Sequence, residues 1–445
     1  MRWLVPLFLA ALLHAADITA LDRYVAAPDD SFRYELAGTA TVAGATVYTL
    51  DMVSQRFLTP QDVDRTEWRH WLYIVKPAKV ETATGLLIID GGSNPGKPAA
   101  PDAAWVRFAA ETHAVVADLK MVPNQPLVFA GEERGRTEDS FIAYTWDKFL
   151  RTGDPRWPAR LPMTKAAVRA MDAITAFCGS EQGGNVKVSR FVVAGGSKRG
   201  WTTWTTAAVD RRVAAIAPLV IDVPNVETSF IHHWRAYGFW APAVEDYAAM
   251  GIMKWMGKPE FRALMEIEDP YEYRERLTMP KYVVNSSGDQ FFLPDSSQFY
   301  FDRMPGEKYL RYVPNTDHSL ENSDALESLL AWFQAVVSCT PRPRFYWNAD
   351  RAQGTIRLRT LDPPSEVRMW KAINPEARDF RLERIGRAWT SARVEGAEGV
   401  YEASLPRPEQ GFGAFFLELT YPGGMKFTTE VVVAPDVYPF GPPGE

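Results

Sequence analysis

The sequence predicts an α/β protein with a doubly wound, mainly parallel sheet, followed by an antiparallel β-sandwich. Up to residue 340, short apolar runs alternate with helical patterns, as parallel βαβ units require. After residue 340 the helical patterns stop, and short alternating segments follow one another as in a sandwich. A length of 445 residues also favours two domains. We therefore expect one domain over residues 16–340 and a second over 341–445.

The composition excludes several classes of protein. Apolar residues make up 46% and charged residues 23% of the chain, which excludes a disordered or collagen-like protein. The net charge of −6 leaves no basic surplus for nucleic acid or an anionic membrane surface. The 15 Trp, 17 Tyr and 24 Phe residues suit a large core and a pocket lined with rings. We expect a compact protein that does not bind nucleic acid.

The amino terminus has the pattern of a secretory signal peptide. Arg2 precedes an apolar run over residues 3–13, and small residues end the pattern at Ala15 and Ala16. The run is too short for a membrane-spanning helix, which needs about 20 residues. We expect residues 1–15 to be removed, with cleavage after Ala16 as the alternative, and the mature protein to be secreted or periplasmic without a membrane span. A buried amino-terminal helix is the other interpretation.

The elements of the first domain are expected in the following order. Short runs rich in β-branched and aromatic residues predict strands, and apolar residues spaced by three and four predict helices. Strands are expected at 32–36, 45–57, 70–75, 85–90, 113–119, 189–196, 213–222, 281–287 and 309–315. Helices are expected at 103–111, 165–177, 201–209, near 296–304 and at 320–337.

Residues 223–280 break this alternation. The segment is helical in pattern and crowded with Trp, Tyr, Phe and Met. We expect a cap insertion that covers the site and selects the acyl or leaving group of a substrate. A helical insertion with its own core is the alternative.

The second domain should consist of strands alone. They are expected at 345–348, 354–360, 366–372, 380–385, 389–395, 400–405, 414–421 and 426–434. Because residues 341–445 contain no histidine and no cysteine, we expect chemistry to belong to the first domain. The sandwich would then serve stability or substrate attachment, or contact a partner or glycan through its exposed edge strands.

The segment FVVAGGSKRGW at 191–201 carries the strongest chemical signal. An apolar strand runs into a Gly-rich turn that bears Ser197 and then into a helical pattern. The pattern is similar to the nucleophile elbow of α/β-hydrolases, which lifts the hydroxyl clear of the sheet. An ordinary Gly-rich turn between a strand and a helix is the other interpretation. Glycine follows the serine by three positions rather than two, because Arg199 occupies the second. We expect the Arg199 guanidinium to bridge an acid or carbonyl groups behind the elbow without touching substrate.

Two further residues follow the serine in the chain order Ser, Asp, His that this fold uses. Asp289 comes just after the strand at 281–287, and His318 just after the strand at 309–315. Both therefore lie at the carboxyl ends of strands, where open α/β sheets build their sites. His318 would take the serine proton, and Asp289 would orient the imidazole. Asp295 and Asp317 are rival acids, although an N-cap is the simpler role for Asp295.

The backbone supplies the expected oxyanion hole. One donor is the amide of Lys198, next to the nucleophile, and the other is the amide of Gly92 in the loop after the strand at 85–90. We expect no cofactor and no metal, because there is no phosphate-binding glycine pattern, no HExxH motif and no Cys/His cluster. Cys178 and Cys339 are either one disulfide or two small buried residues.

Five segments together resemble the PhoPQ-activated pathogenicity-related protein family, which looks related to autocrine proliferation repressor proteins. They are residues 138–172, 195–204, 232–247, 288–302 and 312–320. The resemblance runs from about residue 25 to the end. It implies an α/β-hydrolase-like fold in a secreted or periplasmic protein, and it places the triad on Ser197, Asp289 and His318. Arg199 matches the family pattern.

These observations favour a secreted serine hydrolase, an esterase or an amidase or peptidase-like enzyme, that acts on a small-molecule or peptide substrate. The reaction would pass through an acyl-enzyme. The alternative is a non-catalytic secreted binding or signalling protein on a hydrolase scaffold, because fold alone does not imply function.

Overall fold

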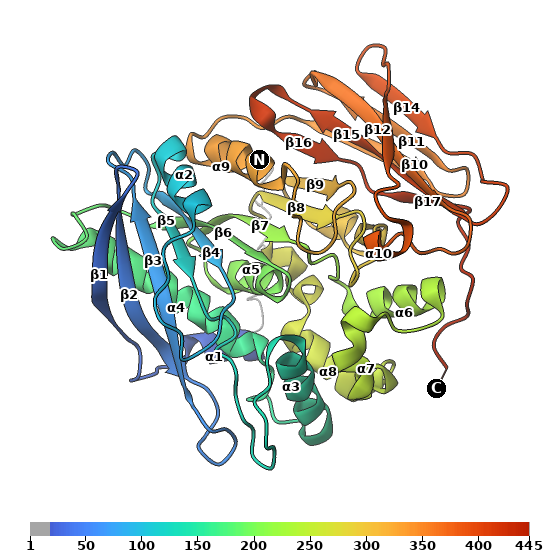
Figure 1. The fold of residues 1–445 in the computed structure, drawn as a ribbon. Coiled ribbons are helices and arrows are strands. Elements are labelled where there is room, and N and C mark those ends of the chain that lie inside the picture. Colours follow the sequence, from blue (N-terminus) through green and yellow to red (C-terminus); the bar gives the residue numbers. More distant parts are fainter. Residues whose placement is uncertain (1–17, 445) are drawn as a thin grey trace, which may run out of the picture.

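The structure is a computed structural model that describes residues 18–444 (Figure 1). The expected signal peptide, residues 1–15, lies outside these residues. No helix in the described part of the chain is both long and apolar enough to cross a membrane.

A long mixed sheet forms the centre of the molecule. The first part of the chain contributes, in sheet order, β1 (Arg33–Val42), β2 (Ala45–Arg56), β3 (Glu67–Lys76), β5 (Val116–Leu119), β4 (Thr84–Ile89), β6 (Arg190–Gly196), β7 (Val213–Leu219), β8 (Lys281–Ser286) and β9 (Lys308–Val313). The pairs from β1 to β5 are antiparallel, and those from β5 to β9 are parallel. The parallel strands are apolar and almost wholly buried, as helices on both faces require.

Helices cover both faces of this sheet (Figure 1). On one face lie α1 (Ala20–Ala26), α3 (Glu138–Thr152), α4 (Arg160–Gly179) and α5 (Lys198–Val209), whose apolar side chains share one core cluster. On the other lie α2 (Ala103–Thr112) and α9 (Ala325–Val337), which pack in a second cluster. This is the doubly wound arrangement that the sequence predicts.

The insertion expected at 223–280 is present between β7 and β8. It consists of α6 (Val226–Tyr237), η1 (Pro242–Val244), α7 (Glu245–Ala249), η2 (Ile252–Trp255), α8 (Pro259–Glu268) and η3 (Pro270–Arg276). The helical stretch expected near 296–304 is two 3₁₀ turns, η4 (Ser296–Phe299) and η5 (Phe301–Arg303).

The carboxyl-terminal strands form two layers. One is a three-stranded antiparallel sheet of β10 (Phe345–Asp350), β11 (Thr355–Thr360) and β14 (Val400–Ser404). The other contains β16 (Lys426–Thr428), β15 (Phe412–Thr420), β12 (Glu366–Asn374) and β13 (Thr390–Arg393), with β17 (Val432–Ala434) also paired to β15. The predicted fold class, an α/β-hydrolase-like domain with a cap and a C-terminal antiparallel sandwich, is confirmed. The boundary at residue 340 remains a prediction.

The two parts are joined through the sheet itself. Strand β16 lies beside β9, with Thr428 opposite Leu310, so the second layer continues the sheet of the first part of the chain. The Thr428 hydroxyl also accepts a hydrogen bond from the Tyr312 amide at 3.0 Å. Side chains from both parts, including Trp332 and Phe427, belong to one core cluster.

Two local features differ from what the sequence predicts. Residues 380–385 are not a strand, because the chain turns into the short helix α10 (Leu382–Ile385), where the Leu382 amide bonds to the carbonyl of Gly288. The two cysteines are not bonded to each other. Cys178 is buried and Cys339 is exposed, and both are free thiols.

Candidate active site

Ser197 lies on a sharp turn between the end of β6 and the start of α5. Its backbone has φ of +57° and ψ of −128°, a strained conformation for a residue with a side chain. Such a strand–turn–helix geometry is that of a nucleophile elbow. The structure therefore places Ser197 at the carboxyl end of a central parallel strand.

The glycines of the elbow are required by close backbone contacts. A Cβ atom at Gly195 would lie 2.8 Å from the backbone of Arg199. A Cβ atom at Gly200 would lie 2.8 Å from the Gly195 carbonyl oxygen and from the Ile221 side chain. Gly200, three positions after Ser197, thus packs directly against Gly195, two positions before it. With glycine at 200 rather than at 199, the long side chain of Arg199 is accommodated.

Arg199 links the elbow to Glu138 and to the backbone at Val122. Its guanidinium donates to both carboxylate oxygens of Glu138, at 2.8 and 2.7 Å, and its Nε–H donates to the Val122 carbonyl. Burial alone would raise the pKa of Glu138, but the hydrogen bonds and charges of Arg199 and Lys198 lower it to about 2. The guanidinium bridges an acid and a carbonyl, as the sequence predicts. Glu138 is the partner that the sequence analysis does not identify.

Asp289 and His318 lie together beyond the ends of β8 and β9. Nδ1–H of His318 donates to Asp289 Oδ2 at 2.8 Å. The second carboxylate oxygen accepts from the Phe291 amide at 2.8 Å, so the buried acid is held on both sides. Nε2 of His318 is buried and has no hydrogen-bond partner within the described residues. This is the nitrogen that a general base must keep free.

Ser197 and His318 are both placed near the rings of Phe291 and Phe292 but are not hydrogen-bonded to each other. Within residues 18–444, no hydrogen bond joins Ser197 Oγ to His318. The two border the same pair of rings: Ser197 lines a cavity with Phe291 and Phe292, and the His318 ring lies 4.4 Å from Phe291 and 6.0 Å from Phe292. Catalytic hydrogen bonds are often long in a ligand-free enzyme and tighten when substrate binds.

The rival acids are engaged elsewhere. Asp317 accepts hydrogen bonds from the backbone and hydroxyl of Ser319. Asp295 stands at the start of η4 without capping it. Its buried carboxylate pairs instead with His232 at 2.9 Å and with Arg378 at 2.5 Å. No group of three or more potential metal ligands occurs among the described residues.

The two expected oxyanion donors lie beside the elbow. The Lys198 amide opens α5 next to Ser197. Gly92 has φ of +126° in the loop after β4, and its neighbour Gly91 is packed against the Arg199 guanidinium, where a Cβ would lie 2.7 Å from a terminal nitrogen. Neither amide has a hydrogen-bond partner in the described part of the chain.

A small cavity of about 40 Å³ opens beside Ser197. Six aromatic side chains line it, namely Trp146, Trp201, Phe230, Tyr247, Phe291 and Phe292. They come from α3, α5, the cap and the loop after Asp289, so the cap helps to form the cavity. The charged lining consists of Asp139, Arg160 and Lys198, and the Lys198 ammonium pairs with Glu138 at 2.8 Å and Asp139 at 3.1 Å.

The sequence analysis assigns no role to Asp139 or Arg160. Both lie within the segment 138–172, which contributes to the family resemblance. No local pattern in the sequence distinguishes them from other charged residues, and only the structure shows that both line the same cavity.

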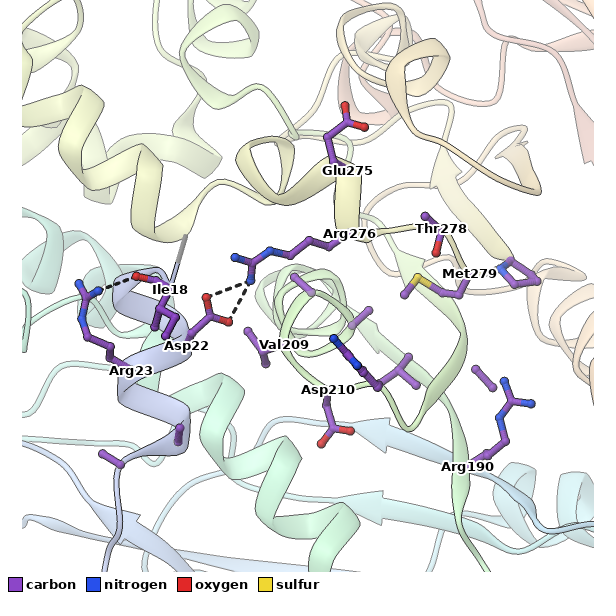
Figure 2. Close-up of a pocket in the computed structure, with 18 residues that line it drawn as sticks. Ile18, Asp22, Arg23, Arg190, Val209, Asp210, Glu275, Arg276, Thr278 and Met279 are labelled. Atoms are coloured by element: carbon purple, nitrogen blue, oxygen red, sulfur yellow. Dashed lines mark hydrogen bonds and ion pairs between the residues drawn. The ribbon is translucent and has the colours of Figure 1, made fainter. Parts of the chain in front are cut away.

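A larger cavity of about 1180 Å³ lies at the opposite end of the sheet (Figure 2). Its lining includes Arg190 at the start of β6 and Val209 at the end of α5, whereas Ser197 lies between the other ends of these elements. An ion pair between Asp22 and Arg276 closes one side. None of the residues that line this cavity is a predicted site residue.

The carboxyl-terminal region forms hydrogen bonds with the two loops that carry Asp289 and His318. The Leu382 amide donates to the Gly288 carbonyl at 2.9 Å, immediately before Asp289. Asn315, three residues before His318, exchanges two hydrogen bonds with the Trp389 backbone, at 2.8 and 3.0 Å.

Comparisons with known proteins agree with this architecture. The chain is 38% identical over 475 aligned residues to autocrine proliferation repressor protein A of Dictyostelium discoideum, covering 99% of this chain and 95% of that protein. An acetyl xylan esterase from Paenibacillus sp. R4 superposes with a TM-score of 0.50 at 15% identity, covering 72% of this chain and 91% of the esterase, which shows a shared fold. Residues 21–381 match the model of the PhoPQ-activated pathogenicity-related proteins, and the chain belongs to that family.

Proposed function

We propose that this protein is a serine hydrolase that cleaves an ester or amide bond of a small-molecule or peptide substrate through an acyl-enzyme. The observation that carries the proposal is Ser197 on a strained elbow after β6, with the hydrogen-bonded pair Asp289–His318 beyond the ends of β8 and β9. The α/β-hydrolase fold supports it.

In this mechanism His318 Nε2 accepts the proton of Ser197 as the hydroxyl oxygen attacks the carbonyl carbon. Asp289 fixes the tautomer that leaves Nε2 free and stabilises the imidazolium. The amides of Lys198 and Gly92 donate to the oxyanion, where positioned donors act on the charge that develops in the transition state. His318 then protonates the leaving group, and water attacks the acyl-enzyme by the reverse sequence.

A fluorophosphonate probe tests this proposal. We expect the probe to label the wild-type protein and not Ser197→Ala, with both proteins melting at similar temperatures. Ser93→Ala is the matched control, because Ser93 is an exposed serine in the neighbouring glycine-rich loop. Labelling of Ser197→Ala at the wild-type rate would show that the elbow serine is not the nucleophile.

We also propose that the protein is exported to the periplasm or the medium. Support comes from the amino-terminal pattern, with its basic start, apolar run and small residues before residue 16. Cell fractionation and amino-terminal sequencing test this, and a mature chain that begins at Ala16 or Asp17 is expected. A full-length chain in the cytoplasm would refute export.

The second candidate function is that of a secreted binding or signalling protein. The name of the Dictyostelium relative, a proliferation repressor, favours it. The contact surface would be the three-stranded sheet, on whose side Tyr346 and Leu361 are exposed. If this function holds, Ser197→Ala retains the biological effect; if the hydrolase acts in it, Ser197→Ala abolishes the effect.

A further inference from the structure

Arg160 is a buried cation in the cavity beside Ser197. It is the first residue of α4, its relative exposure is 1%, and it lines the cavity together with Ser197. The guanidinium lies 4.4 Å from the centre of the Trp201 ring, and one terminal nitrogen contacts Met163 Sδ at 3.5 Å. Its Nε is buried without a hydrogen-bond partner.

The anionic groups near Arg160 are committed to other donors. Glu268 accepts from the Arg160 backbone amide at 3.2 Å and from the Trp146 indole, and no ion pair joins it to the guanidinium within the described residues. Burial raises the pKa of the Glu268 carboxyl, although the Arg160 charge acts in the opposite direction, so Glu268 faces Arg160 through space without a hydrogen bond to its guanidinium. Asp139 binds the Lys198 ammonium and the Tyr247 hydroxyl.

A buried guanidinium without a carboxylate partner costs free energy, because it has given up its water. Costly buried groups of this kind are concentrated at functional sites, where a ligand can supply the missing partner. A carboxylate suits the planar fork of arginine, which can donate two parallel hydrogen bonds. The cavity volume of about 40 Å³ leaves space for only a few atoms beyond the serine.

We propose that Arg160 binds a carboxylate at the end of a short acyl group, so that the substrates are half-esters or half-amides of small dicarboxylic acids. This inference rests on the proposed function. Ser197 Oγ would form a bond to the acyl carbon as the alcohol or amine leaves with the serine proton. Water would then cleave the acyl-enzyme, releasing the dicarboxylic acid and regenerating the serine.

The test compares 4-nitrophenyl half-esters of malonate, succinate and glutarate with the corresponding carboxamides, in which the free carboxylate is replaced by an uncharged group of the same shape. We expect kcat/KM for the anionic ester to exceed that of its carboxamide by at least tenfold at one chain length. A charge-assisted hydrogen bond supports a ratio of that size.

Variants assign the preference to a residue. Arg160→Gln should remove the preference for the anion, mainly through a higher KM, and Arg160→Lys should retain part of it. Arg169→Gln is the matched control on the same helix, because Arg169 pairs with Asp172 at 3.0 Å and lies over Phe32 rather than in the cavity. It should keep the wild-type preference.

Binding separates this inference from the proposed function. Titration calorimetry of Ser197→Ala with succinate, against succinamide, needs no turnover. Succinate binding that disappears in Ser197→Ala/Arg160→Gln supports the carboxylate site even if no ester is cleaved. Equal rates for every ester pair, together with no Arg160-dependent succinate binding, overturn the inference, while fluorophosphonate labelling of Ser197 would leave the hydrolase proposal intact.

Discussion

The proposed nucleophile and the proposed acid–histidine pair are held in place by different parts of the chain. Ser197 is fixed by its own strand and helix, by glycines at 195 and 200, and by the Arg199–Glu138 ion pair. The loops of Asp289 and His318 are held by hydrogen bonds from Leu382 and Trp389, in the carboxyl-terminal region.

This difference changes what the last hundred residues are expected to do. The composition of residues 341–445 suggests that they take no part in the chemistry, because they contain no histidine and no elbow. The contacts at Gly288 and Asn315 argue that they position two of the three proposed catalytic residues.

Removing the carboxyl-terminal region should have the largest effect. We expect residues 16–341 expressed alone to lose fluorophosphonate labelling and to melt well below the protein of residues 16–445. The loops of Asp289 and His318 lose their hydrogen-bond partners, and the shared core around Trp332 and Phe427 is opened. A fragment that labels at the full rate would show that residues 16–341 form the site without the carboxyl-terminal region.

Asp289→Asn should lower kcat by about 10⁴-fold, the loss seen in a model triad whose histidine takes the wrong tautomer. Steady-state hydrolysis of an activated ester measures it. Asp317→Asn is the control, because that carboxylate bonds to Ser319 and not to His318. If Asp317→Asn proves the more damaging change, the acid has been assigned to the wrong residue.

Asn315→Ala isolates the support given by Trp389. Loss of two hydrogen bonds should shift the histidine loop, and a displacement of about 1 Å can cost up to about 100-fold in rate. We expect kcat to fall by up to about that factor with a smaller change in KM. Asn348→Ala, an exposed asparagine of β10, should behave as wild type. Unchanged kcat in Asn315→Ala would mean that the contact with Trp389 is dispensable.

Glu138→Gln tests the support of the nucleophile and should have the smallest effect. The pKa of Glu138 is lowered from 4.5 to about 2, so its ion pair stabilises the fold fully above about pH 4.5. That contribution is lost as the pH falls towards 2. The melting temperature of Glu138→Gln should therefore lie below wild type at neutral pH and converge with it in acid. Glu133→Gln, at an exposed site, should follow wild type throughout, and a difference that is independent of pH would exclude the ion pair as the cause.

The site is predictable from sequence where it depends on local structure. The elbow follows from an apolar strand, small residues and a helix in succession, and the positions of Asp289 and His318 follow from chain order and strand ends. Glu138, Arg160 and most of the aromatic lining are not predictable in this way, because all of these residues except Trp201 meet Ser197 from segments 33 or more residues away in the sequence. The turn at Leu382 is a similar case. The residue pattern at 380–385 is typical of a strand, but in the structure Leu382 begins a short helix and its amide is hydrogen-bonded to the distant Gly288 carbonyl.

The pairing of β16 with β9 also has a consequence for the time course of folding. The outer neighbour of β9 includes Thr428, so it leaves the ribosome more than a hundred residues after Leu310. Until then, the nascent chain presents a strand with free backbone groups and an apolar face without its cover. The central sheet is therefore complete only when translation is almost finished, and a chaperone that shields this strand in the interval would prevent it from pairing with a second nascent copy.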